Sequence, residues 1–238
     1  MKPCAFVGQP LTSHIEGCLS MLEAFTRKNQ GYFEVASRRI RAALGERTVE
    51  PEKVEEMARL AVLFHDVGKA YNYFQKRFDD NCSSNRVGFQ YHEVASAAMC
   101  YKFLSTQPKW ASVEKVLVVL SVLNHHHAMR NPFKMISEGD DRGKVLCIVK
   151  EGFCEGDLPS TFEKFNVNLR GAVLRGEDVS SFYSWINGVR KMNRVEKWLK
   201  LYVLVMNPLI IADNLDARRR GEMNEARRAF IEEIEEVG

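Results

Sequence analysis

Histidines and aspartates on apolar helical stripes, far apart in the chain, are the sequence feature that most constrains the fold. The chain has six histidines, and five of them fall in one interrupted pattern with two aspartates. The pattern consists of His14, His65-Asp66 in FHDVGK, His92 in YHEVASAA, His125-His126 and Asp213. Imidazole and carboxylate groups are ligand types that hold borderline transition metals. The pattern therefore predicts a metal site with more than one ion.

The periodicity of the apolar residues indicates a mainly helical chain. Apolar residues recur at helical spacing in segments that include His14, His65, His92 and His126, and in a long stripe that ends at Asp213. We find no internal repeat and no low-complexity linker. The sequence therefore predicts one mainly helical domain that spans residues 1–238.

Local signals predict where several helices begin or bend. Ser13 and Glu16 match a capping box, so we expect the first helix to start at Ser13. Pro51 suits the first turn of the second helix, and Ser112 can cap the helix before the histidine run. Pro208 lies inside the last long stripe, where we expect a kink.

Residues 130–180 give a weaker signal because glycine and proline interrupt them. Lys144–Val149 reads as a short strand that could pair with Phe165–Leu169, where apolar residues alternate. We therefore expect a short β-hairpin in the 140–170 region.

Composition and charge exclude few functions. Apolar residues make up 45% and charged residues 27%, as in ordinary globular proteins, and the net charge of +3 is too small to indicate a partner. There is no apolar run of about 18 residues, so no membrane span is expected. The first residues lack the basic and apolar segments of a signal peptide. We expect a cytoplasmic protein.

The cysteines fall singly, without a CxxC pair, at positions 4, 18, 82, 100, 147 and 154. We expect reduced thiols that act as small apolar side chains, in preference to a disulfide framework or a thiolate zinc site.

Each predicted ligand has an ordinary structural alternative. Asp213 ends an apolar stripe, and a buried carboxylate needs a cation or hydrogen bonds, which an arginine or a helix cap could also supply. A histidine on an apolar face, as His65 is, is more often a satisfied core residue. The neighbouring Asp66 favours a ligand, since two ligand types at a helix end can point toward two ions.

Three consecutive histidines could also lie on the surface. On a helix they would point about 100° apart, so all three cannot bind at one site. We predict that His125 and His126 are ligands and that His127 is not. The complete set then holds seven nitrogen and oxygen donors and no thiolate. Two ions of the Mn, Fe, Co or Ni type suit it better than structural zinc, with Mg²⁺ as a further candidate. Paired metals of this kind hydrolyse phosphate esters.

These motifs resemble the HD superfamily of metal-dependent phosphohydrolases, and most closely the HD nuclease of type I CRISPR interference systems. The likeness rests on HDxGK with Lys69, HExxSA from His92 to Ala97, the histidine pair and Asp213, and it covers residues 10–216. It implies an all-α HD-domain helical bundle.

The resemblance also implies roles for the residues. One ion would be held by His14, His65, Asp66 and Asp213. The second would be held by Asp66, His92, His125 and His126, so that Asp66 bridges the two. Asp66 and Lys69 would be catalytic, with Lys69 neutralising charge on the phosphate. A lysine at an exposed helix C-terminus is the ordinary alternative for Lys69.

The implied substrate is single-stranded DNA, with RNA as a further candidate. Many relatives are fused to a helicase, but this sequence has no Walker A motif, since the segment from Gly139 to Val145 is one residue short and lacks its Ser or Thr. We therefore expect no ATP site, and a nuclease that works with a separate CRISPR-associated helicase and a crRNA-guided surveillance complex.

Two other functions fit the same residues. A dinuclear HD phosphohydrolase that acts on nucleotides or cyclic nucleotides would share the ligand set, although no GYP motif follows the histidine pair. A scaffold without activity would be expected to have lost ligands, and all of them are present here.

Overall fold

The computed structural model describes residues 2–44, 49–85, 88–126, 139–191 and 200–219. In these ranges the chain is predominantly helical with one small antiparallel strand pair, so the prediction of a helical fold is confirmed. Within the same ranges, no helix combines the length and the apolar character that crossing a membrane requires.

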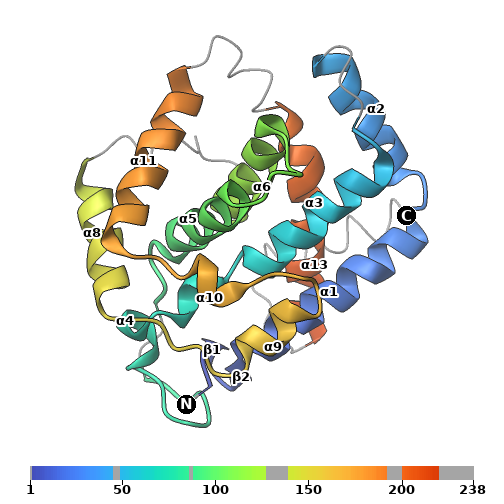
Figure 1. Cartoon of the computed structure of the whole chain (residues 1–238). Helices are drawn as coiled ribbons and strands as arrows, with labels where there is room; N and C mark the ends of the chain where they lie inside the picture. The colour runs from blue at the N-terminus through green and yellow to red at the C-terminus, as the bar shows by residue number, and fades with distance from the viewer. Residues whose placement is uncertain (1, 45–48, 86–87, 127–138, 192–199, 220–238) are drawn as a thin grey trace.

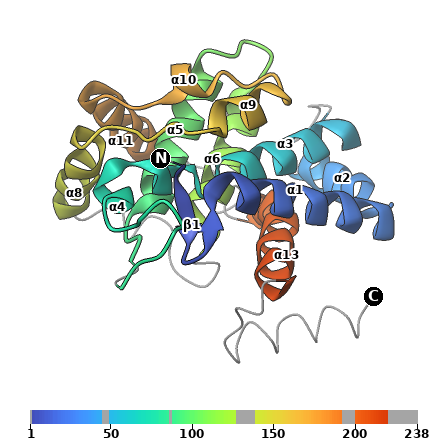
Figure 2. The same ribbon diagram turned by 90° about the horizontal axis from the view of Figure 1, so that it is seen from below.

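Five helices pack around a common apolar core and carry the predicted ligands. They are α1 (Leu11–Lys28), α3 (Pro51–Phe64), α5 (His92–Ser105), α6 (Ser112–Asn124) and α13 (Val203–Arg219). α1 lies along α13, α3 contacts both α13 and α6, and α5 pairs with α6. Figure 1 shows α5 and α6 side by side at the centre, and Figure 2 shows α13 packed against α1.

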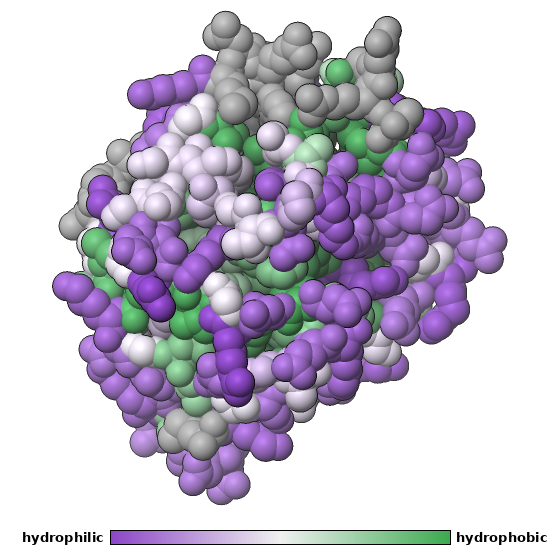
Figure 3. Space-filling view, in the orientation of Figure 1, coloured by the Kyte–Doolittle hydropathy of each residue, from purple (hydrophilic) through white to green (hydrophobic). Residues whose placement is uncertain are grey.

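The remaining elements surround this core. They are β1 (Cys4–Phe6), β2 (Gln9–Pro10), α2 (Tyr32–Leu44), the 3₁₀ helix η1 (Val67–Ala70), α4 (Asn72–Gln75), α8 (Gly139–Lys150), α9 (Leu158–Glu163), α10 (Leu169–Ala172) and α11 (Gly176–Lys191). α8 and α11 pack against each other at one side of α5 (Figure 1). On the face shown in Figure 3, hydrophilic residues cover most of the periphery and apolar residues are visible mainly across the middle.

The starts of α1 and α6 differ from the predictions. α1 begins at Leu11, directly after the extended Pro10, and Ser13 makes no cap. The Leu11 amide instead donates to the Pro3 carbonyl at 2.7 Å, which the N-terminal hairpin brings close. Ser112 is the first residue of α6, and the Glu114 carboxylate accepts a hydrogen bond from the Ala111 amide. The start of α3 at Pro51 is confirmed.

The prediction of a β-hairpin in the 140–170 region is wrong. Lys144–Val149 lies inside α8, where Val145, Ile148 and Val149 are buried on one helical face. Packing of this face against α11 decides the conformation, which short apolar runs leave open. Phe165–Leu169 forms a turn that reverses at Asn166, with φ at 58°, and then enters α10. The antiparallel hairpin lies instead at Cys4–Pro10.

The expectation of six free thiols is wrong for two cysteines. Cys4 and Cys82 form a disulfide across 78 residues of sequence, while Cys18, Cys100, Cys147 and Cys154 are free. Gln75 holds the Cys4 backbone through its side chain, which accepts from the Cys4 amide at 2.8 Å and donates to the Cys4 carbonyl at 3.0 Å. Tertiary contacts thus bring the two thiols together, so their sequence spacing contains no sign of the pairing.

Candidate metal centre

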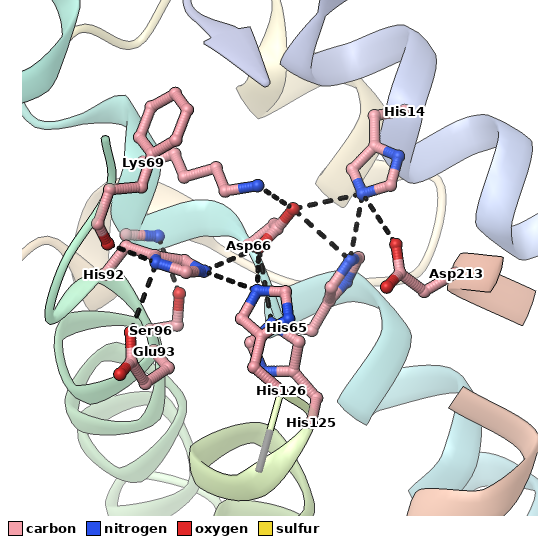
Figure 4. A network of polar contacts seen from close by, with 12 residues as sticks. His14, His65, Asp66, Lys69, His92, Glu93, Ser96, His125, His126 and Asp213 are labelled. Carbon is pink, nitrogen blue, oxygen red and sulfur yellow. Dashed lines mark hydrogen bonds and ion pairs between the residues drawn. The ribbon is translucent and has the colours of Figure 1, made fainter. Parts of the chain in front are cut away.

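Five helices deliver the seven predicted ligands to one buried point. His14 comes from α1, His65 and Asp66 follow the last turn of α3, His92 starts α5, His125 and His126 follow α6, and Asp213 lies in α13. Figure 4 shows these side chains grouped around Asp66. The structure therefore brings together all seven residues that the sequence singled out.

The two oxygens of Asp66 face different groups of histidines. Oδ2 lies 3.0 Å from His14 Nε2 and 3.6 Å from His65 Nε2. Oδ1 lies 3.0 Å from His92 Nε2, 3.4 Å from His125 Nε2 and 4.0 Å from His126 Nε2. One carboxylate thus stands between two sets of imidazole donors, which is the placement that a bridging ligand needs.

This arrangement produces two sets of donor atoms. Within each set, all the donor atoms lie within 4.8 Å of one another. One set is His14, Cys18, His65 and Asp213, and the other is Asp66, His92, His125 and His126. Asp213 Oδ1 contacts His14 Nε2 at 3.5 Å. Cys18 was not predicted as part of the site. Burial raises the pKa of its thiol to about 11, so at neutral pH it is a protonated neighbour and a poor ligand.

Hydrogen bonds to backbone carbonyls orient three of the histidines. Nδ1 of His65 lies 2.7 Å from the Val62 carbonyl, and Nδ1 of His125 lies 2.6 Å from the Val122 carbonyl. His92 makes the same contact with Phe89. A carbonyl oxygen only accepts, so each Nδ1 is the donor and Nε2 is the ring nitrogen that faces Asp66. Metal-binding histidines are commonly oriented in this way.

A second aspartate, Asp216, holds His14. Its Oδ2 accepts a hydrogen bond from His14 Nδ1 at 2.8 Å. The helices α1 and α13 can approach closely enough because residue 17 is a glycine: a Cβ there would lie 2.0 Å from Asp216 Oδ1. Neither Gly17 nor Asp216 was predicted from the sequence as part of the site. The spacing of Asp213 and Asp216, one helical turn apart, was the available signal for the second carboxylate.

A close approach at Gly68 positions η1 against the start of α5. A Cβ at Gly68 would lie 2.3 Å from the His92 carbonyl oxygen, and its amide donates to Ser96 Oγ at 2.8 Å. The glycine of FHDVGK and the serine of YHEVASAA thus meet, which fixes Asp66 relative to His92. Glu93 in the same motif is buried and its Oε2 lies 3.2 Å from His92 Nδ1.

The donor set fits divalent cations. Asp66 Oδ1 and His125 Nε2 are buried and have no hydrogen-bond partner among the described residues. Buried polar atoms of this kind call for a cation or another compensating group. Nε2 atoms also converge in pairs, at 3.1 Å for His14 with His65 and 3.1 Å for His92 with His126. Imidazole and carboxylate donors suit divalent metal ions.

The charge state of the centre follows from its burial and its carboxylates. Burial alone would raise the pKa of Asp66, but the Lys69 ammonium and the surrounding imidazoles hold it well below its usual value. Burial would lower the pKa of His14, yet its hydrogen bonds to the carboxylates of Asp216 and Asp66 raise it well above its ordinary value. Asp66 is therefore an anion, and protons compete with any metal at His14.

Two other histidines are held neutral. Burial lowers the pKa of His65 to about 4, with part of the effect opposed by Asp66. Burial and the neighbouring His125 and His92 also lower the pKa of His126. A neutral imidazole has a free lone pair, so these rings are ready to bind a cation near neutral pH. The His126 side chain keeps 26% of its surface accessible while the other six ligands are buried, so solvent reaches the centre at this side chain.

Lys69 is buried, so the alternative of an exposed lysine at a helix end is wrong. Its Nζ lies 2.6 Å from Asp66 Oδ2 and 4.0 Å from the centre of the Phe6 ring. Figure 4 shows it on the side of Asp66 away from His125 and His126. Its direct effect is to neutralise and orient Asp66. His127, predicted not to be a ligand, lies outside the described residues.

The sequence matches the HD domain family over residues 14–151. The match covers more than half of the chain and contains six of the seven gathered ligands, from His14 to His126, while Asp213 lies beyond it. This chain belongs to the HD domain family. The HD domain match, together with the relatives that follow, identifies a metal-dependent hydrolase of the CRISPR-associated HD nuclease type.

Two relatives of this HD protein are each named as a CRISPR-associated endonuclease Cas3-HD. The one from Saccharolobus solfataricus is 29% identical over 237 residues, covering 91% of this chain and 89% of the relative. The one from Pyrococcus furiosus is 25% identical over 142 residues, covering 60% of this chain and 56% of the relative.

A solved structure has the same fold. The CRISPR-associated Cas3 HD domain protein from Methanocaldococcus jannaschii superimposes with a TM-score of 0.63 at 21% sequence identity, covering 88% of this chain and 99% of that one. At this identity the likeness supports the HD helical fold that the sequence predicted.

Proposed function

We propose that this HD protein is a nuclease that hydrolyses phosphodiester bonds of single-stranded DNA with two divalent ions. The observation that carries the proposal is the Asp66 carboxylate, whose two oxygens face two separate sets of imidazoles. A single ion would leave one of these sets without a role. When bound, the two ions supply an activated water and stabilise charge on the phosphate.

We assign one ion to His14, His65, Asp66 and Asp213, and the other to Asp66, His92, His125 and His126. Asp66 would be the ligand shared by both ions, and Lys69 at 2.6 Å keeps it an anion. Lys69 in turn provides positive charge close to the reacting phosphate, as a lysine clamp does.

The partners in this proposal come from the kind of relative that the chain matches. The matched proteins are CRISPR-associated, and we propose that this nuclease acts in the cytoplasm with a separate CRISPR-associated helicase and a crRNA-guided surveillance complex. A helicase would supply the single strand, since the proposed substrate is unpaired DNA. Cutting of a duplex target that depends on ATP and on the added helicase would support this part.

The cleavage assay uses circular and linear single-stranded DNA, with chelator or with Mn²⁺, Ni²⁺, Co²⁺ or Mg²⁺. We expect cutting only with metal, and loss of cutting in Asp66→Ala. Asp80→Asn is the matched control, because it removes an exposed carboxylate outside the centre and should leave activity unchanged.

Two outcomes would contradict the proposal. Metal-dependent cutting that survives Asp66→Ala would show that the bridge is dispensable. Hydrolysis of free nucleotides with an intact single strand would identify a nucleotide phosphohydrolase instead.

A further inference from the structure

One cavity of the structure contains none of the seven ligands but is lined by Tyr91, the residue before His92. It has a volume of about 510 Å³ and lies between α4 with its following residues, residues 88–91 and α8. The side chains that matter for its chemistry are Tyr73, Arg77, Gln90, Tyr91, Lys144 and Cys147. A volume of this size is within the ~300–1,000 Å³ range of small-ligand sites.

Aromatic rings and cations alternate along the wall of this cavity. The Arg77 guanidinium lies 5.5 Å from the centre of the Tyr73 ring. The Lys144 ammonium lies 5.1 Å from the centre of the Tyr91 ring and donates to its hydroxyl at 3.0 Å. Both tyrosines are half-buried, and both cations are exposed. Half-buried rings are held in place yet keep a surface on which a flat group can stack.

The cavity has a positive lining. Arg77 and Lys144 contribute two cations, and no Asp or Glu occurs among the described residues that line it. The whole chain, in contrast, has nearly balanced charge, with 34 basic and 31 acidic residues. The imbalance is therefore local and favours an anionic ligand. Stacking rings next to cations match the two parts of a nucleotide, a flat base and a phosphate.

The backbone connects this cavity directly to the centre. Tyr91 lines the cavity, and the next residue, His92, contacts Asp66 Oδ1 at 3.0 Å. Consecutive Cα atoms are only about 3.8 Å apart, so the backbone of the cavity wall continues directly into a ligand of the centre. His92 also contacts His126, the ligand at which solvent enters. The cavity is thus lined by a residue that is adjacent in the chain to a ligand of the metal centre.

We propose that this cavity binds the nucleotide next to the bond that is cut, with its base stacked on Tyr73 and Tyr91 and its backbone phosphate paired with Arg77 and Lys144. The inference rests on the proposed nuclease function and deepens it, since it identifies how a single strand is positioned. Stacking accepts any base, so the site selects for an unpaired strand and not for a sequence.

Binding of single-stranded DNA is measured in the presence of a chelator, so that bound metal does not contribute to the measured affinity. The probe is a short fluorescent oligothymidylate and the readout is anisotropy with the full chain. Tyr73→Ala is expected to weaken binding about 5- to 160-fold, the range found when one stacking ring is removed. Tyr73→Phe keeps the ring and should restore binding to near the wild-type value.

The charge contribution is tested by salt dependence. Lys144→Gln is expected to reduce the slope of log affinity against log salt by about 0.7, the value for one phosphate contact on a single strand. Lys150→Gln is the matched control, because Lys150 is exposed on the same helix and does not line the cavity. In the cleavage assay, Tyr73→Ala and Lys144→Gln should raise KM more than they lower kcat.

Cys147 provides a direct probe of occupancy. It is an exposed free thiol that lines the cavity, whereas Cys18 and Cys100 are buried. The oligothymidylate should slow its reaction with a maleimide in chelator, and Cys147→Ser identifies the labelled site.

The results separate this inference from the proposed function. If the wild type cuts single strands while Tyr73→Ala and Lys144→Gln bind like Lys150→Gln, or if the oligothymidylate leaves Cys147 unprotected, the inference is overturned and the nuclease stands. If the wild type neither binds nor cuts a single strand, the proposed function fails and the inference fails with it.

Discussion

The Cys4–Cys82 disulfide is expected to contribute strongly to the stability of the chain. It closes a loop of 78 residues, and the loop-entropy relation for this length gives a stabilisation of about 4.5 kcal/mol. The bond also ties the N-terminal hairpin to the segment that leads to Phe89, whose carbonyl orients His92. Its removal should therefore lower the free energy of unfolding and loosen one side of the metal centre.

The shift in melting temperature follows from the size of the chain. With about 2.1 cal/mol/K per residue, the 238 residues have an unfolding entropy of about 0.5 kcal/mol/K. Dividing about 4.5 kcal/mol by this entropy gives a fall of about 9 °C in Tm for the double variant Cys4→Ser/Cys82→Ser.

The assay is thermal unfolding followed by circular dichroism, in chelator, with and without reductant. Reductant should lower Tm of the wild type and of Cys147→Ser, which removes an exposed free thiol, and should have no effect on the double variant. Titration of the unfolded wild type without reductant should find four free thiols. Six titratable thiols, or equal Tm values for wild type and double variant, would refute the reasoning.

Three further predictions concern the metal centre. Gly17→Ala should displace Asp216 from His14. The affinity for the ion assigned to His14 should then fall by about 10- to 100-fold, measured by calorimetric titration. Asp213→Asn should reduce occupancy of the ion assigned to His14 more than that of the other, measured by metal analysis after dialysis. His65 has a folded pKa of about 4 against an ordinary 6.5, so the unfolded chain binds a proton first as pH falls. The free energy of unfolding should therefore decrease between pH 6.5 and 4, by about 1.4 kcal/mol per unit in chelator, and His65→Gln should lack this component.

Each of these predictions has a control and a contrary result. Gly31→Ala adds a methyl group where nothing lies within 4 Å, so it should leave metal affinity unchanged. Equal affinity in Gly17→Ala would show that Asp216 does not orient His14. Equal loss of both ions in Asp213→Asn would contradict the assignment of ligands. An unchanged pH slope in His65→Gln would mean that other groups cause the acid destabilisation.

Helical periodicity was a sound guide where an apolar face is long. The stripes of α1, α3, α5 and α6 were readable because their buried residues repeat at helical spacing over three turns or more. The prediction of a strand at Lys144–Val149 was wrong because a run of six residues has too few turns to distinguish a helix from a strand. The predicted start of α1 at Ser13 was wrong because the Leu11 amide is satisfied by the Pro3 carbonyl, which lies outside the helix.

The sequence by itself determined which residue types the centre could use, since His65, His92 and Asp213 on apolar faces demand a partner in the core. The tertiary structure alone decided what surrounds them. Asp216 reaches His14 only because α1 and α13 touch at Gly17, and Cys82 meets Cys4 across 78 residues. Such contacts depend on how separate helices and loops pack, and the spacing of residues along one element contains no information about the distance to another.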